Sequence, residues 1–150
     1  EIIRRSAKIL GVETEGGAER AIAKRARFTP RTANYFLKRA RDYAQVHKKA
    51  LDDDAVAEAL KMLGVDEVGL TPSDRKLLQT MADKFGGGPV GLGTLAAALS
   101  EEEATIEEFN EPYLIQLGLI ERTPRGRTLT VNGYNHIGLT PPKNLQNKLL

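Results

Sequence analysis

Apolar residues in the first 64 positions recur every three or four residues, a spacing that predicts short amphipathic helices. Thr29 followed by Pro30 has the form of a helix N-cap with proline at the first helical position. Gly64 is placed to end the last of these helices. The predicted helices cover residues 1–10, residues 17–26, a stretch that starts at Thr29-Pro30, and a stretch from Asp52 or Asp53 to Gly64. The pattern predicts a small helical bundle.

A mixed pattern follows a linker at residues 65–70. The run Thr105-Ile106-Glu107-Glu108 has the form of a capping box and predicts the start of a helix that Pro112 should kink. The predicted elements are, in order, a helix from Thr71-Pro72 to Gly86-Gly87-Gly88-Pro89, a short strand at Val90, a helix over 92–99, a helix from Thr105 to Gly118, and a hairpin with strands at 119–120 and 128–131. This order is typical of a winged helix.

The chain is therefore predicted to be mostly α, with a small helical bundle in residues 1–66 and a winged-helix domain with a β-hairpin wing in residues 67–150. The tail after Pro141-Pro142 is expected to be poorly ordered. The absence of cysteine excludes disulfides, thiolate metal sites and a cysteine nucleophile. No apolar run approaches the roughly 20 residues of a membrane span, so no membrane partner is expected. The first residue is not Met, and we expect the chain to be part of a longer protein.

The predicted wing carries three arginines, Arg122, Arg125 and Arg127, around a Pro-Arg-Gly-Arg turn. From Arg122 to the end of the chain there are five basic residues and no acidic one. A guanidinium stays charged and matches phosphate oxygens with two parallel donors. A solvated hairpin whose arginines serve solubility is the plainer alternative. The pattern favours contact with duplex DNA.

The predicted helix over 105–118 is acidic, with Glu107, Glu108 and Glu111 and no Lys or Arg. In most winged helices this helix enters the major groove. An acidic helix there would repel the phosphates that flank the groove, and we expect its carboxylates to face solvent. DNA binding is therefore predicted to be led by the wing, directed at the backbone and largely independent of sequence.

Other candidate chemistry is weak. Gly86, Gly88 and Gly91 match a dinucleotide-binding pattern, but a helix instead of a strand precedes them, and we interpret them as a turn. His47 and His136 have no His or Cys at metal-ligand spacing, so we predict no metal site and no catalytic residue in this chain.

Several motifs, taken together, resemble the RuvB family, bacterial AAA+ ATPases that drive Holliday-junction branch migration. The motifs are Leu63-Gly64-Val65-Asp66, Lys84-Phe85-Gly86-Gly87-Gly88-Pro89-Val90-Gly91, Glu111-Pro112-Tyr113-Leu114-Ile115-Gln116 and the segment from Arg122 to Arg127. The resemblance covers nearly the whole chain. It implies an AAA+ lid followed by a winged helix, without the large nucleotide-binding domain.

The resemblance also implies roles for individual residues. Arg31, with Pro30 before it, matches the family's ATP-sensing arginine, and Arg122 and Arg127 match positions that contact DNA, with Arg125 beside them. Two residues depart from the family pattern: Phe28 stands where glycine is usual before Thr-Pro-Arg, and Glu103 where arginine is common.

For the intact protein, the resemblance implies an ATP-dependent DNA translocase of the bacterial cytoplasm, acting in recombination, DNA repair and the SOS response. It would work as a homohexamer with ATP and Mg²⁺, and would bind RuvA through the large domain. This chain alone is expected to be inactive as an ATPase and to hold no cofactor stably. Two alternatives remain: a sequence-specific winged-helix transcriptional regulator with a helical dimerisation domain, and a winged helix that binds only protein.

Overall fold

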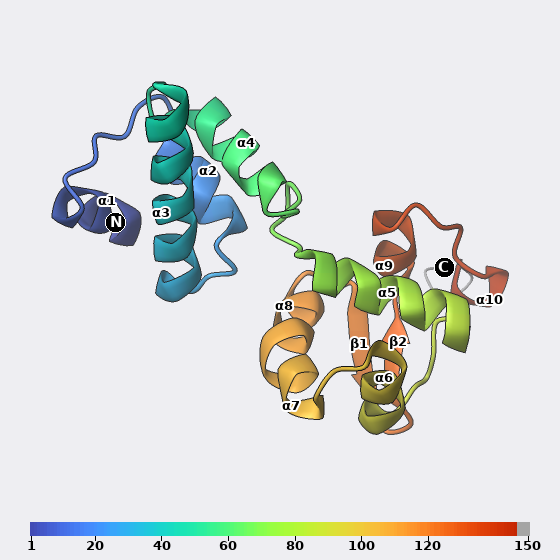
Figure 1. The fold of residues 1–150 in the computed structure, drawn as a ribbon. Coiled ribbons are helices and arrows are strands. Elements are labelled where there is room, and N and C mark those ends of the chain that lie inside the picture. The colour runs from blue at the N-terminus through green and yellow to red at the C-terminus, as the bar shows by residue number, and fades with distance from the viewer. Residues whose placement is uncertain (147–150) are drawn as a thin grey trace. The chain divides into compact units, whose positions relative to one another are not determined.

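The computed structural model describes residues 1–146 and divides the chain into two compact units, which we call unit 1 (Glu1–Pro72) and unit 2 (from Ser73 onward) (Figure 1). Helices dominate both units, and the described strands form one two-stranded antiparallel sheet in unit 2. The predicted fold class, mostly α with a short β-hairpin, is confirmed. No helix within residues 1–146 is both long and apolar enough to cross a membrane.

Unit 1 is a four-helix bundle arranged around its longest helix (Figure 1). The helices are α1 (Ile2–Ile9), α2 (Ala18–Arg25), α3 (Pro30–His47) and α4 (Asp53–Met62). Helix α3 packs against each of the other three. The side chains of Ile22, Leu37 and Leu60 are fully buried between the helices, as the three-and-four spacing predicts.

The predicted start and stop signals of unit 1 are confirmed. The Thr29 hydroxyl accepts a hydrogen bond from the Thr32 backbone N–H at 3.2 Å, and Pro30 is the first residue of α3. Of the two aspartates proposed as the cap of α4, the N-cap is Asp52, which accepts from the Ala55 N–H at 2.9 Å. These caps fix where α3 and α4 begin.

Unit 2 has the element order of a winged helix. Its elements are α5 (Pro72–Phe85), α6 (Leu92–Leu99), α7 (Glu103–Thr105), the π-helical turn η1 (Ile106–Asn110), α8 (Glu111–Gln116), β1 (Ile120–Thr123), β2 (Gly126–Leu129), α9 (Val131–His136) and α10 (Lys143–Gln146). The short strand expected at Val90 is an isolated bridge, paired with Arg127 in β2.

The predicted capping box at Thr105 is wrong. The helical segment starts earlier, at Glu103, with Glu102 as its N-cap. Thr105 already has helical backbone angles, φ −61° and ψ −45°, and its side chain makes no cap hydrogen bond. A capping side chain needs the extended backbone of a residue just outside the helix, which Thr105 does not have.

The predicted helix over 105–118 is not one regular α-helix. The Glu111 N–H bonds to the carbonyl of Ile106, five residues back, which defines the π-helical turn η1. Pro112 follows at once and has no N–H, and its ring would clash with a carbonyl four residues earlier in a regular helix. The widened turn relieves this clash.

The predicted strand over 128–131 is two residues too long. The Thr130 hydroxyl accepts from the Gly133 N–H at 3.0 Å and caps α9, a helix that the sequence pattern did not predict. Residues Lys143–Gln146 form α10, so the tail expected to be poorly ordered contains a helical turn. The rest of that tail, residues 147–150, lies outside the described part of the chain.

The glycine-rich turn after α5 is fastened to the hairpin. Val90 and Arg127 exchange backbone hydrogen bonds of 3.0 and 2.8 Å, and the Leu129 N–H donates to the Gly87 carbonyl at 2.7 Å. Gly88 has φ +95°, and a Cβ there would meet the backbone oxygen of Arg127. Glycine is therefore required for close backbone approach, in agreement with the interpretation of this segment as a turn.

Candidate nucleic-acid interface

The wing is a tight hairpin that places its arginines close together. Strands β1 and β2 pair from Ile120↔Leu129 to Thr123↔Gly126, and Arg122 lies directly opposite Arg127. The Thr123 hydroxyl donates to the Gly126 carbonyl at 2.8 Å and accepts from the Arg125 N–H at 3.3 Å, which closes the turn. The sequence-predicted arginines are thus brought together on one hairpin.

The three arginines differ in their surroundings. Arg125 is exposed at the turn, and its side chain makes no hydrogen bond or ion pair with any residue in the range 1–146. The Arg122 side chain is about half exposed at 52%, whereas that of Arg127 is only 13% exposed. Of the three arginines predicted to contact DNA, Arg127 is therefore the most covered by its neighbours.

The Arg127 side chain is covered because it pairs with Glu111, a buried carboxylate that the sequence pattern placed in solvent. Its side chain is 1% exposed. The Arg122 Nε donates to Glu111 Oε1 at 2.6 Å, and the Arg127 Nε donates to Glu111 Oε2 at 3.0 Å. Each carboxylate oxygen therefore has its own guanidinium, and the expectation that Glu111 is ordinary helix-surface charge is wrong.

The π-helical turn explains why Glu111 points inward. In a regular α-helix, a residue five positions after Ile106 lies about 140° around the axis from it. The hydrogen bond from the Glu111 N–H to the Ile106 carbonyl instead places Glu111 over Ile106, which is itself buried. Because the π-turn changes the register, an α-helical pattern counted from Ile106 does not predict the inward position of Glu111.

The residue before Glu111 fixes the same segment to α5. The Asn110 Nδ2 donates to Asp74 Oδ1 at 2.7 Å and to the Ser73 hydroxyl at 3.2 Å, and Asn110 and Asp74 are both buried. Two consecutive polar side chains are thus anchored on opposite partners, one on α5 and one on the wing. Buried polar groups with partners of this kind hold a helix in one orientation.

The electrostatics of the wing stay positive after this pairing. Glu111 offsets one of the three arginine charges, and exposed Glu107 approaches Arg122 at 3.7 Å. Exposed pairs such as Glu107–Arg122 are weak because water screens them. The turn residue Arg125 and the half-exposed Arg122 are the cations best placed to meet a phosphate; DNA contact by these residues stays a prediction.

The other candidate residues lie in unit 1, at the start of α3. Pro30 and Arg31 are the first two residues of this 18-residue helix, and Arg31 is exposed. The preceding residues, Arg27 and Phe28, both have left-handed backbone angles, φ +54° and +56°. That conformation is strained for a bulky residue such as Phe28 and normal for glycine, the residue that the resemblance implies at this position.

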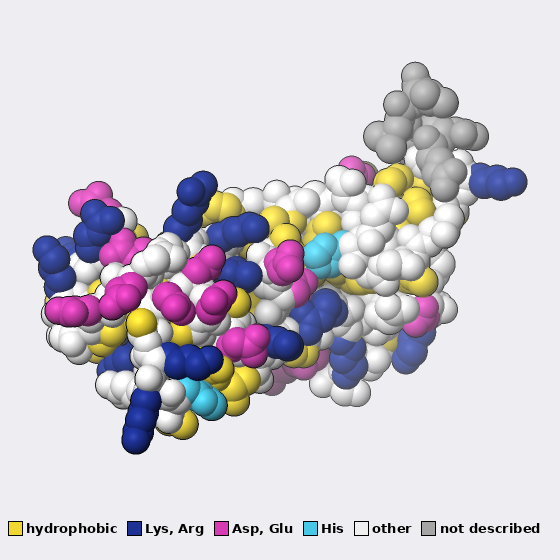
Figure 2. All heavy atoms as spheres, turned by 90° about the horizontal axis from the view of Figure 1, so that it is seen from above, with side chains coloured by type: hydrophobic (Ala, Val, Ile, Leu, Met, Phe, Trp, Pro, Cys, Tyr) yellow, Lys and Arg dark blue, Asp and Glu magenta, His cyan; other side chains and the backbone are white. Residues whose placement is uncertain are grey.

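On the side of the molecule drawn in Figure 2, Lys and Arg side chains alternate with Asp and Glu over unit 1. No continuous basic face is visible on that side. Arg41, for example, lies 2.7 Å from Asp42. Glu103, the second residue that departs from the pattern of the resemblance, is the exposed first residue of α7. No group of three or more His, Asp or Glu within residues 1–146 is arranged to hold a metal ion.

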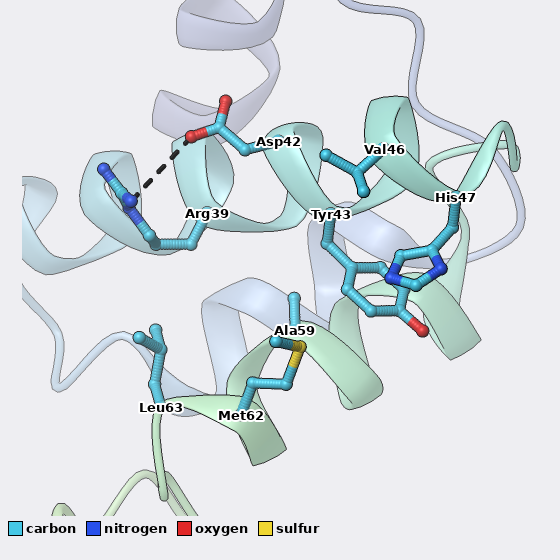
Figure 3. Close-up of a pocket in the computed structure, with 8 residues that line it drawn as sticks. All are labelled: Arg39, Asp42, Tyr43, Val46, His47, Ala59, Met62 and Leu63. Atoms are coloured by element: carbon cyan, nitrogen blue, oxygen red, sulfur yellow. Dashed lines mark ion pairs between the residues drawn. The ribbon is translucent and has the colours of Figure 1, made fainter.

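A shallow groove of about 320 Å³ lies between α3 and α4 (Figure 3). Tyr43 and His47 stack at 4.2 Å along its α3 side, with Met62 opposite on α4. His47 is exposed, and its ring lies against that of Tyr43 at a tilt of 36°. The groove has no buried cation or nucleophile in its lining and is not part of the candidate interface.

Comparison with known proteins identifies both units. The family model of the RuvB AAA lid domain matches residues 1–66, and that of the RuvB C-terminal winged helix domain matches residues 67–138. A solved structure of the Thermotoga maritima RuvB Holliday junction branch migration motor is 44% identical, with a TM-score of 0.90 over 93% of this chain and 47% of that one.

A point mutant of the Thermotoga maritima protein is also 44% identical, with a TM-score of 0.90 over 94% of this chain and 48% of its own. The chain thus spans about half the length of the solved structures that it matches.

Proposed function

The chain belongs to the RuvB family, and we propose that its two units are the lid and the DNA-gripping end of an ATP-driven Holliday-junction branch-migration motor. The observation that carries the proposal is the wing, where Arg122, Arg125 and Arg127 gather on one rigid hairpin. The sequence-specific regulator gains no support, because both units match domains of a motor protein.

The wing would grip the phosphate backbone of duplex DNA. Arg125 has no competing ion pair among the described residues, and Arg122 is half exposed. The helix that would normally enter the major groove carries exposed Glu107 and Glu108, which oppose a close approach of phosphates. Binding through the wing alone would contact phosphates and no base edges, so its affinity would not depend on the DNA sequence that the motor crosses.

Unit 1 would report the state of bound ATP. Arg31 is exposed in the first turn of α3, whose Thr29 cap and Pro30 fix the start of the helix. A guanidinium there suits a phosphate oxygen of ATP held by a separate nucleotide-binding domain, and the γ-phosphate would be lost on hydrolysis. Movement of α3 with Arg31 would then move the bundle around it, because α3 packs against all three other helices.

The remaining parts of the proposal concern the whole motor. We propose a homohexamer in the bacterial cytoplasm that hydrolyses ATP with Mg²⁺ and serves recombination, DNA repair and the SOS response. RuvA would bind through the nucleotide-binding domain. Residues 1–150 contain no P-loop sequence, because Leu92-Gly93 stands where the Lys and Ser/Thr would be after Gly86 and Gly91.

The test is the affinity of this chain for two unrelated duplexes over a series of salt concentrations. We expect weak binding of equal affinity to both duplexes. In a plot of log affinity against log salt concentration, each phosphate contact should contribute about −0.9 to the slope. Arg125→Gln should reduce that slope by about one contact without changing the melting temperature. Lys143→Gln, a basic residue of α10 beyond the wing, is the control.

The outcomes separate the alternatives. Strong preference for one duplex would support the sequence-specific regulator, and no salt-dependent binding would support a winged helix that binds only protein. ATP turnover by the purified chain that disappears with Arg31→Ala would contradict the proposal that the chain alone is inactive.

A further inference from the structure

Glu111 is the buried group that the proposed grip leaves unexplained. It lies on the acidic side of the wing, where a carboxylate should weaken DNA binding, yet it is 1% exposed and contacts both Arg122 and Arg127. Burying a carboxylate is unfavourable unless its partners compensate. Its position therefore calls for a role beyond surface charge.

The geometry of the contacts indicates that role. Arg122 contacts Oε1 through both Nε at 2.6 Å and Nη2 at 2.5 Å, and Arg127 contacts Oε2 through Nε at 3.0 Å. A guanidinium has five N–H donors, so Nη1 of Arg122 still has donors for another ligand. One carboxylate thus holds two like-charged side chains close together, an arrangement that their mutual repulsion would otherwise oppose.

We propose that Glu111 is a positioning residue for DNA binding, which holds the half-exposed Arg122 in place for a phosphate and fixes it to the largely buried Arg127. The π-turn η1 aims Glu111 at the wing, and Asn110 fixes that turn to Asp74 on α5. The inference rests on the proposed function, because it needs the wing to bind duplex DNA. Long arginine side chains that are already ordered lose less conformational entropy on binding.

The test compares two removals of the same charge. Glu111→Gln removes the carboxylate that holds the arginines, and Glu108→Gln removes an exposed carboxylate from the same helical segment, three residues earlier. Simple electrostatics predicts that both changes strengthen DNA binding. We expect opposite signs: Glu108→Gln binds the duplex at least as tightly as the parent chain, whereas Glu111→Gln binds about tenfold more weakly near 0.1 M salt.

Glu111→Asp separates position from charge. It keeps the carboxylate but shortens the side chain by one methylene, so it cannot reach both Nε atoms at 2.6 and 3.0 Å. We expect it to lose affinity as Glu111→Gln does. If Glu111→Gln and Glu111→Asp both bind as tightly as Glu108→Gln, Glu111 is only an opposing charge and the proposal is wrong.

A measurement on the unaltered chain covers the case in which these variants unfold. The Nε–H NMR signals of Arg122 and Arg127 should be protected from exchange with water, and they should stay protected when a duplex is added. Loss of protection on adding DNA would mean that phosphates remove the arginines from Glu111, which overturns the proposal. If the parent chain shows no salt-dependent binding at all, the proposed function fails instead, and the two failures are distinct.

Discussion

Replacing Arg127 with Met should destabilise unit 2 through the carboxylate that it leaves behind. Arg127 donates to Glu111 Oε2 at 3.0 Å, and the two side chains are 13% and 1% exposed. Removing one partner of a buried ion pair typically costs about 3–5 kcal/mol in the free energy of unfolding, because the remaining charge is left buried without a partner. Here Arg122 still contacts Oε1, so we expect a loss of about 2–3 kcal/mol in the free energy of unfolding.

A second change tests whether the loss comes from the unpaired charge. In the double variant Glu111→Met with Arg127→Met, no charge stays buried, and Arg122 can be solvated at its 52% exposed position. Apolar replacement of a buried pair is often neutral. We expect the double variant to be within about 1 kcal/mol of the parent chain, so that adding Glu111→Met restores most of the stability lost in Arg127→Met.

The assay has to report on unit 2 alone, because two units need not unfold in one step. Urea titration followed by NMR signals of backbone amides in β1 and β2 meets this need. For a domain of this size, 2–3 kcal/mol also corresponds to a fall of roughly 10–20 °C in melting temperature. A loss below about 1 kcal/mol in Arg127→Met, or a double variant no more stable than Arg127→Met, would refute the view that this pair stabilises the wing.

Three further changes test other parts of the fold. Thr29→Ala should cost about 1 kcal/mol in unit 1 alone, measured by urea unfolding, because the N-cap of α3 is lost. Gly133→Ala should cost about 1–3 kcal/mol in unit 2, since its Cβ would meet the Leu119 carbonyl. Tyr134→Phe should cost about 1 kcal/mol through the lost 3.0 Å hydrogen bond to the Gly86 carbonyl. Burial raises the pKa of the Tyr134 phenol, so unit 2 of the parent chain should keep its stability up to about pH 10 and lose stability above that pH. The Tyr134→Phe variant should lack this loss. Identical alkaline unfolding curves for the two proteins would contradict the prediction.

Local signals in the sequence predicted most of unit 1. Thr29-Pro30, Asp52 and Gly64 each act through the backbone within a few residues, so their effect does not depend on distant partners. The same holds for the glycine-rich turn after α5. Signals of this kind predict where helices begin and end.

The candidate site was predictable only in part. The hairpin and its arginines follow from the turn and the flanking β-like runs, but the partner of those arginines does not. Glu111 is eleven residues from Arg122 and sixteen from Arg127. Its inward position depends on a π-turn, and a periodicity of 3.6 residues counted from Ile106 assigns it to the wrong face.

The C-terminal error has a similar origin. Thr128 to Val131 has the pattern of one β-like run, because threonine and valine favour strands. Thr130 nevertheless leaves the strand to cap α9, and its hydroxyl also donates to the Gly118 carbonyl at 2.6 Å. Residue preference cannot distinguish these two uses of threonine.

The backbone exchange between Val90 and Arg127 has a mechanical consequence. An isolated two-stranded hairpin bends readily at its base, and a load applied at its tip would mostly deform it. Here the loop after α5 acts as a brace along β2, with a further bond from the Leu129 N–H to Gly87. A pulling force on a ligand bound at Arg125 would be transmitted by these hydrogen bonds to α5, a helix of 14 residues. The hairpin would then resist bending under that force.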